Sequence, residues 1–378
     1  MSLKAISAKR IFDGHSFHFD SALIWHGDRI VSIVAHSDLP EHIDLDHFPD
    51  CTITPGFIDL QVNGGGGVMF NQQTDISGVE TICAAHRKHG TAYLLPTLVS
   101  DTRDKMDQAL HTIQAAISKN TTGILGIHLE GPWLNPVKRG AHFDKFLYSP
   151  EVCELEQMPW LTNGKVLITL APECVDTEAI KWLSDCGIVV SCGHSNAAQQ
   201  QLRDSVGYIH GYTHLFNAMS PLTGREPGVV GTAFNSDNAW CSIIADGVHV
   251  ASNNVLLAQK IKPKGKLLVV TDAMATLGDD RGYFTLGDET IYVDGKKLVN
   301  GEGNLVGAHI GLDESLANLI QWGIDESEAI KMISTYPAHA IHLDHTIGYL
   351  KPEFSASATI LDENYQTQSV LVNGKLHR

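Results

Sequence analysis

The sequence predicts an α/β fold: a (β/α)8 TIM-type barrel accompanied by a small β-sandwich domain that both termini form. Three observations predict it. Eight short apolar runs recur through the middle of the chain, helical patterns lie between them, and both ends alternate apolar with polar residues. Continuous apolar runs are typical of strands buried on both faces, as parallel barrel strands are. We assign residues 1–54 and 350–378 to the small β domain and residues 55–349 to the barrel.

Both ends of the chain carry the short alternating runs and turn signals of antiparallel strands. Near the N-terminus, HGD at 26–28 precedes RIVSIV at 29–34. Near the C-terminus, SATIL at 357–361 and SVLVNGK at 369–375 show the same pattern. Two similar ends around a different middle indicate that the termini combine in one domain.

The apolar runs are spaced about 20 to 40 residues apart, as strands separated by helices would be. They read FIDL, AYLLPTL, ILGIHL, VLITL, IVVSC, YTHLF, CSIIA and LLVVT, beginning near residues 57, 92, 124, 166, 188, 212, 241 and 267. Between them, 101–120 place apolar side chains on one helical stripe, and 74–90 end on a glycine that suits a helix C-cap. The alternative, an open doubly wound sheet, usually has a G-x-G-x-x-G turn, which GGGGVMF at 64–70 does not match.

Composition excludes several classes of protein. Of the 378 residues, 43% are hydrophobic and 19% charged, which is ordinary for a folded soluble protein, and the formal net charge of −16 argues against nucleic acid or an anionic membrane as a partner. No apolar run approaches the roughly 18 residues of a membrane span, and the N-terminus shows no signal peptide. Seven cysteines without a C-x-x-C pair indicate reduced thiols and a cytoplasmic location.

Polar side chains follow the apolar runs, where a parallel barrel carries its functional residues. Taken singly, a histidine here could be structural, Glu130 could be a turn residue, and Asp272 could cap a helix. Together, Glu130, His194 and His214 form a His₂Glu set, the ligand set of catalytic zinc. Such an ion lowers the pKa of bound water to about 7. Asp272, after the eighth run, can then take the proton and pass it to a leaving group, which predicts metal-assisted hydrolysis.

Because the chain is acidic overall, an anionic substrate would need a local cluster of hydrogen-bond donors or positive charges at its binding site. Arg225 lies downstream of His214 in a loop bounded by glycine and proline, and its guanidinium suits phosphate or carboxylate. A surface salt bridge is the alternative for Arg225. His249, on another loop at the same end of the barrel, could supply a second donor.

Six segments of the chain together resemble N-acetylglucosamine-6-phosphate deacetylases of the amidohydrolase superfamily. They are PGFIDLQVNGGGG, GIHLEGPWLNPVKRGAH, VVSCGHSNA, THLFNAMSPLTGREPG, IADGVHV and LLVVTDAM. HLEGP and HLFNAM with GREPG are specific motifs, whereas PGFID occurs in many amidohydrolases. The resemblance implies hydrolysis of the acetamide of N-acetyl-D-glucosamine 6-phosphate to D-glucosamine 6-phosphate and acetate, in amino-sugar catabolism and recycling.

The resemblance also implies roles for individual residues. Glu130, His194 and His214 would bind the catalytic metal, and Asp272 would act as general base and then as the acid that protonates the amine. His142 would polarise the acetyl carbonyl and stabilise the oxyanion.

The family is usually homodimeric, and this resemblance implies a phosphate site to which the neighbouring subunit contributes. Asn217, the backbone of Ala218, Arg225 and His249 would hold the sugar phosphate.

Gln61 and Asn63 stand where many amidohydrolases carry His-x-His, which holds a second metal ion. Because neutral amides are poor ligands beside imidazole, we expect one divalent ion per subunit, zinc first, with iron, cobalt or manganese as alternatives. Gln61 and Asn63 are expected to make hydrogen bonds around the site. The four glycines that follow are expected to let the loop turn sharply beside the metal.

Two other functions are alternatives to deacetylation. A cyclic-amide hydrolase of the dihydroorotase type usually needs His-x-His and a bridging lysine, and the His-x-His is absent here. A barrel that has lost catalysis and serves as a binding protein typically loses its ligands, whereas Glu130, His194, His214 and Asp272 are all present.

Overall fold

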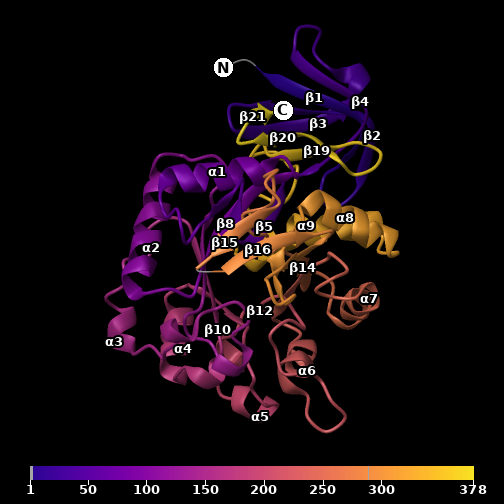
Figure 1. Cartoon of the computed structure of the whole chain (residues 1–378). Helices are drawn as coiled ribbons and strands as arrows, with labels where there is room; N and C mark the ends of the chain where they lie inside the picture. Colours follow the sequence, from indigo (N-terminus) through magenta and orange to yellow (C-terminus); the bar gives the residue numbers. More distant parts are fainter. Residues whose placement is uncertain (1–2, 288) are drawn as a thin grey trace.

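The centre of the molecule is a parallel sheet of eight strands. The computed structural model describes residues 3–287 and 289–378, and places the strands in the order β14-β13-β12-β11-β10-β9-β8-β5 (Figure 1). Their bounds are β5 (Phe57–Val62), β8 (Thr91–Val99), β9 (Gly126–Glu130), β10 (Lys165–Leu170), β11 (Val189–Cys192), β12 (Gly211–Tyr212), β13 (Trp240–Ile243) and β14 (Leu267–Val269). Each strand begins within two residues of a predicted apolar run, so the barrel prediction is confirmed.

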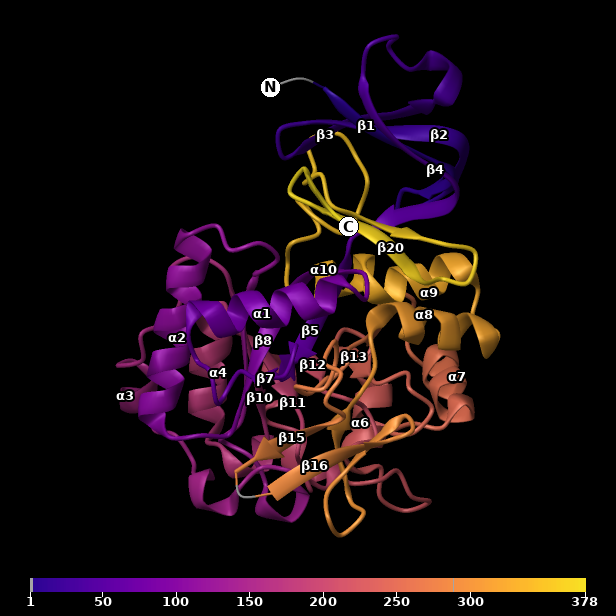
Figure 2. The same cartoon turned by 45° about the horizontal axis from the view of Figure 1, so that its top comes forward.

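Helices connect and cover the strands (Figure 2). They are α1 (Ile76–Arg87), α2 (Arg103–Ser118), α3 (Val152–Leu155), α4 (Thr177–Asp185), α5 (Gln199–Leu202), α6 (Gly228–Asn235), α7 (Ser252–Ile261), α8 (Leu312–Gln321), α9 (Glu326–Ile333) and α10 (Thr335–Ala340). The helices predicted at 74–90 and 101–120 are α1 and α2. Each helix begins at an N-cap residue, Asp75 for α1 and Thr102 for α2. The side chain of the N-cap residue accepts a hydrogen bond from a backbone N–H of the first turn. In the described part of the chain, no helix combines the length and apolarity needed to cross a membrane.

The barrel closes along a seam between β5 and β14. These two strands are at the ends of the strand order, and short contacts join their carboxyl ends. The Asp272 N–H donates to the Gln61 carbonyl at 3.0 Å, and the Asn63 N–H donates to the Ala273 carbonyl at 2.9 Å. The seam therefore brings the ends of the first and eighth strands together.

The two termini form one β unit, as predicted. Its seven strands are hydrogen-bonded in the order β21-β20-β19-β4-β1-β2-β3 and lie beside the barrel (Figure 1). Their bounds are β1 (Lys4–Phe12), β2 (Phe17–His26), β3 (Arg29–Ala35), β4 (Asp44–Pro55), β19 (Ala358–Leu361), β20 (Thr367–Val372) and β21 (Lys375–His377). The β1–β4 pair is parallel and the other neighbours are antiparallel. An apolar cluster of its own, including Leu23, Trp25 and Ile360, fills this unit.

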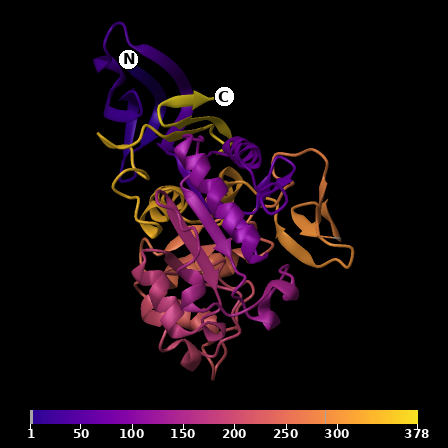
Figure 3. The ribbon, with the colours of Figure 1, turned by 90° about the vertical axis from the view of Figure 1, so that its left-hand side faces the viewer.

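A small antiparallel sheet that the sequence pattern does not predict is inserted after β14. Its strands are β15 (Tyr283–Leu286), β16 (Glu289–Asp294), β17 (Lys297–Val299) and β18 (Leu305–Ala308). Figure 3 shows it standing off one side of the barrel. Phe284, Ile291, Leu298 and Val306 pack with Met274 in a separate apolar cluster. The last strand returns the chain to the mouth of the barrel.

The glycine run forms a tight hairpin next to β5. Its strands are β6 (Gly64–Gly65) and β7 (Val68–Met69), and Gly66 and Gly67 make the turn with φ of 62° and 84°. A Cβ on Gly64 would lie 2.4 Å from the Val68 carbonyl oxygen. Because neither the turn nor this close approach leaves room for a side chain, glycine is needed here.

Candidate metal centre and active site

The polar side chains singled out in the sequence gather at the carboxyl ends of the barrel strands. Glu130 is the last residue of β9, and His194 and His214 each lie two residues beyond their strands, β11 and β12. Asn63 directly follows β5, and Asp272 lies three residues after β14. Five strands thus deliver side chains to one end of the barrel.

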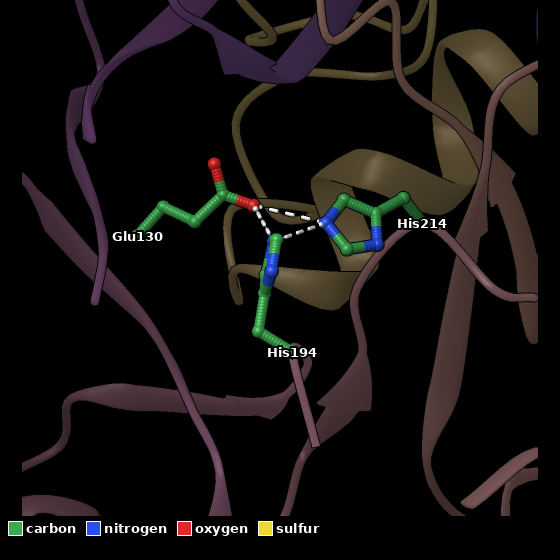
Figure 4. A group of neighbouring side chains, drawn as sticks. All are labelled: Glu130, His194 and His214. Carbon is green, nitrogen blue, oxygen red and sulfur yellow. Dashed lines mark hydrogen bonds and ion pairs between the residues drawn. The ribbon is translucent and has the colours of Figure 1, made fainter. Parts of the chain in front are cut away.

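Glu130, His194 and His214 form a buried cluster whose side chains point toward one another (Figure 4). The Glu130 Oε1 lies 3.2 Å from His194 Nε2 and 3.0 Å from His214 Nε2, and the two nitrogens are 3.0 Å apart. Ligands of a tetrahedral zinc, bound at about 2.0–2.2 Å, lie about 3.3 Å apart. Burial opposes ionisation of Glu130, but its contacts with the two imidazoles hold the pKa of this carboxyl well below its usual range.

The protonation of His194 shows that these three atoms suit a cation. Its Nδ1 lies 2.8 Å from the Lys138 carbonyl oxygen, which can only accept a hydrogen bond. The neutral ring therefore carries its proton on Nδ1 and presents a lone pair at Nε2. That lone pair faces the carboxylate oxygen of Glu130 at 3.2 Å, and two acceptor atoms at this distance repel each other unless a positive charge lies between them. The donor set fits a divalent metal ion.

Residues of the cluster adopt strained backbone conformations. His194, His214 and Asp272 have positive φ values of 50°, 36° and 54°. Side chains other than glycine rarely adopt this left-handed conformation, which costs about 1–3 kcal/mol per residue. The strand ends thus turn abruptly to direct these three side chains into the mouth of the barrel.

Asp272 is held by the two amides that replace His-x-His. Asn63 Nδ2 donates to Asp272 Oδ1 at 2.6 Å, and Gln61 Nε2 lies 3.1 Å from the same oxygen and 2.9 Å from Glu130 Oε1. Burial, together with the neighbouring Glu130 carboxylate, raises the pKa of Asp272 to about 6. A carboxyl that titrates near neutrality can both accept and donate a proton under working conditions.

His142 reaches the site from the loop between β9 and β10. Its ring is 97% buried, and it meets the His194 ring edge to face at 4.5 Å. Its Nε2 lies 3.9 Å from Glu130 Oε2, beyond hydrogen-bond distance. Burial lowers the pKa of His142 to about 3, and the neighbouring His194 contributes to this decrease. His142 is therefore neutral near pH 7.

The cluster lies at the base of a pocket of about 210 Å³. Asn217, Ala218 and His249, three predicted substrate contacts, line this pocket. His249 Nδ1 lies 2.6 Å from Asp246 Oδ2; burial works against the charged ring, but this carboxylate raises the pKa of His249. An imidazole whose protonated form is favoured in this way, at the wall of the pocket, suits an anionic substrate.

Arg225 lies elsewhere. It is exposed on the loop 221–226 and is not among the residues that line the pocket.

Three residues of the site are not indicated by the sequence motifs. Leu305 and Gly307 of β18 form part of the pocket wall, and Ser100 contacts His142. Ser100 directly follows β8, so the strand-end rule could have found it.

A larger groove, of about 580 Å³, lies at the opposite end of the barrel strands. His210, Trp240 and Lys266, at or just before the starts of β12, β13 and β14, contribute to its lining. None of the metal-cluster residues reaches it. Parallel barrels carry their chemistry at the carboxyl ends of the strands, so the smaller pocket is the candidate active site.

Known proteins resemble the chain over most of its length. Residues 52–377 match the model of the amidohydrolase family. An N-acetylgalactosamine-6-phosphate deacetylase from Shewanella sp. (strain ANA-3) is 38% identical over 333 residues, covering 86% of this chain and 83% of the relative. An N-acetylglucosamine-6-phosphate deacetylase from Haemophilus influenzae is 35% identical over 370 residues, covering 94% of each chain.

A solved structure shares the whole architecture. It is a variant of N-acetyl-D-glucosamine-6-phosphate deacetylase from Mycobacterium smegmatis in complex with N-acetyl-D-glucosamine-6-phosphate. It superposes with a TM-score of 0.91 at 27% identity, covering 100% of this chain and 99% of that one. The chain therefore belongs to the amidohydrolase family, in the group that holds the N-acetylhexosamine-6-phosphate deacetylases.

Proposed function

We propose that this protein hydrolyses the acetamide of N-acetyl-D-glucosamine 6-phosphate to D-glucosamine 6-phosphate and acetate. The observation that carries the proposal is the convergence of Glu130, His194 and His214 on one point, beside Asp272, at the base of a pocket. The relatives that are 32–38% identical are deacetylases of N-acetylhexosamine 6-phosphates, which supports that substrate class.

The metal would be held by Glu130 Oε1 and the Nε2 atoms of His194 and His214. When bound, a divalent cation acidifies water and polarises an amide carbonyl. Zinc is the proposed ion because His₂Glu is a ligand set of catalytic zinc, and iron, cobalt or manganese are alternatives. We propose one ion per subunit, because the amides of Gln61 and Asn63 donate hydrogen bonds where other amidohydrolases place imidazoles.

Two side chains of the pocket would move protons and hold the reacting carbonyl. Asp272 would take a proton from the attacking water as the C–O bond forms, and would deliver it to the amine nitrogen as the C–N bond breaks. His142, neutral at working pH, would donate its Nε2–H to the acetyl oxygen as negative charge develops there. Acetate and the free amine are then the two products.

The phosphate would be bound at the outer part of the pocket. Asn217, Ala218 and His249 line the pocket, and the side chains of Asn217 and His249 and the backbone of Ala218 would donate to the phosphate. Arg225 is exposed in the single chain, so its proposed contact with the phosphate requires the loop 221–226 to meet another site. We propose a homodimer in which Arg225 reaches the pocket of the neighbouring subunit.

A second candidate substrate differs at one carbon. The relative from Shewanella acts, by its name, on N-acetylgalactosamine 6-phosphate, the C4 epimer, and is 38% identical to this chain. This candidate shares the acetamide, the phosphate and the chemistry of the site, so only recognition of the C4 hydroxyl separates the two.

Acetate release from four sugars tests these assignments: the two N-acetylhexosamine 6-phosphates and their unphosphorylated forms. Metal content is counted on the same sample. We expect the highest kcat/KM with N-acetylglucosamine 6-phosphate and little turnover without the phosphate. Faster hydrolysis of the galactosamine epimer would replace the first substrate with the second. No acetate from either phosphorylated sugar, with metal bound, would refute the proposed function.

A further inference from the structure

Ser100 makes two contacts with one ring nitrogen of His142. The backbone N–H of Ser100 donates to His142 Nδ1 at 3.2 Å, and the Ser100 hydroxyl oxygen lies 2.7 Å from the same atom. Both residues are buried, with exposed fractions of 4% and 3%. The two residues are far apart in sequence and come together because the loop after β9 folds back over the end of β8.

These contacts determine which nitrogen of His142 carries the proton. A backbone N–H can only donate a hydrogen bond, so His142 Nδ1 must present its lone pair to Ser100. The proton of a neutral imidazole is then on Nε2. The hydroxyl of Ser100 donates to the same lone pair, because its other acceptor, the Glu130 carbonyl oxygen, is farther away at 3.4 Å.

The opposite edge of the ring faces the pocket. His142 Nε2 lies 3.9 Å from Glu130 Oε2, and within the described residues this nitrogen makes no hydrogen bond. An Nε2–H in this position is free to donate to an acceptor that enters the pocket. The same ring with its proton on Nδ1 would present a lone pair there and would repel a carbonyl oxygen.

We propose that Ser100 is a positioning residue that fixes the tautomer and orientation of His142, so that the Nε2–H points at the acetyl oxygen of the substrate. This inference rests on the proposed function for the purpose of the hydrogen bond, but not for the tautomer itself. Ser100 is not among the residues that line the pocket, so it is not proposed to touch the substrate. It acts by making His142 a donor before the substrate arrives, which avoids reorganisation during the reaction.

The tautomer is measured directly by ¹⁵N NMR of protein labelled at histidine, with the His142 signals assigned from their loss in His142→Gln. We expect His142 of the wild-type chain to be unprotonated at Nδ1 and protonated at Nε2, with or without metal. A protonated Nδ1 would overturn the inference even if the enzyme is fully active. The expected tautomer in a chain that releases no acetate would leave the tautomer assignment standing and refute the proposed function.

Variants of Ser100 test its effect on the reaction. Ser100→Ala removes the hydroxyl but keeps the backbone N–H. We expect kcat to fall about 5- to 20-fold, which corresponds to the loss of one hydrogen bond between uncharged groups, about 1–1.8 kcal/mol. KM should stay within about twofold of the wild-type value. Ser100→Thr keeps the hydroxyl and should restore kcat to within about threefold. The matched control is Ser315→Ala, which removes a buried hydroxyl that, among the described residues, bonds only the Gly311 carbonyl. Wild-type kcat in Ser100→Ala would overturn the positioning role.

Discussion

Ionisation of Asp59 should destabilise the folded chain, and Asp59→Asn should reveal the effect. Asp59 is fully buried in β5, beside the seam of the barrel. It accepts hydrogen bonds from the Thr271 hydroxyl at 2.5 Å and from the Thr271 and Gln61 N–H groups at 3.2 Å each. The His86 imidazole is fully buried with its Nδ1 4.0 Å from Asp59 Oδ2, and burial lowers the pKa of His86 to about 4, so the ring is neutral near pH 7.

The size of the effect follows from the pKa of Asp59. Burial raises it from 3.8 to about 7, although the Thr271 and Gln61 hydrogen bonds oppose the increase. Between these two values the folded chain keeps a proton that the unfolded chain releases, so stability falls as pH rises through this window and is constant above it. The full difference corresponds to about 4 kcal/mol, of which about 2.5 kcal/mol falls between pH 5 and pH 8.

The assay is urea unfolding of the wild type and Asp59→Asn at pH 5, 6, 7 and 8, with metal removed by chelation from both. The amide resembles the protonated acid in shape and cannot ionise. We therefore expect the difference in free energy of unfolding, Asp59→Asn minus wild type, to increase by about 2.5 kcal/mol from pH 5 to pH 8. Asp50→Asn, at an exposed position, is the control and should show no such trend. A difference between wild type and Asp59→Asn that stays constant from pH 5 to pH 8 would refute the reasoning.

Three further predictions concern the reaction and the metal. Asp272→Asn should lower kcat by about 10²- to 10⁴-fold while the metal content stays unchanged, because it removes general acid–base catalysis; near-normal kcat would contradict that role. Arg225→Ala should raise KM for the phosphorylated sugar about tenfold or more, and an unchanged KM would mean that Arg225 does not bind phosphate. Elemental analysis should find one divalent ion per wild-type chain and a second in the double variant Gln61→His, Asn63→His; a count that stays at one would show that imidazoles alone do not create the second site.

The barrel could be predicted because its signal is local. A strand buried on both faces needs an unbroken apolar run, and β5, β8 and the six strands between β8 and the seam all begin at such a run. The terminal strands carry the alternation of half-buried sheets. The inserted sheet of β15–β18 was missed because its strands are short and partly exposed. Tyr283 and Tyr292, for example, are 47% and 51% exposed, so no continuous apolar run marks them.

The candidate site could be predicted only in part, for the same physical reason. Glu130, His194, His214 and Asp272 lie at or just beyond the ends of strands, and the geometry of parallel strands brings such residues together. The contact between Ser100 and His142 depends on the path of a loop, which no local pattern encodes. The contacts of Arg225 depend on the conformation of an exposed loop and on what packs against it. A sequence motif does not encode either of these.

The amides at the end of β5 explain how the site keeps two carboxylates close together. If the Gln61 amide were reversed, its oxygen would face Glu130 Oε1 and Asp272 Oδ1, and acceptors would repel one another. The neighbouring carboxylates therefore fix the N–H groups of Gln61 toward both of them, while Asn63 donates again to Asp272. Amide donors thus stabilise the charge of Glu130 and of Asp272, and the Gln61 amide bridges the two. Neutral amide donors lower the pKa of the Asp272 carboxyl less than a neighbouring cation would. The carboxyl therefore remains able to exchange a proton near neutral pH.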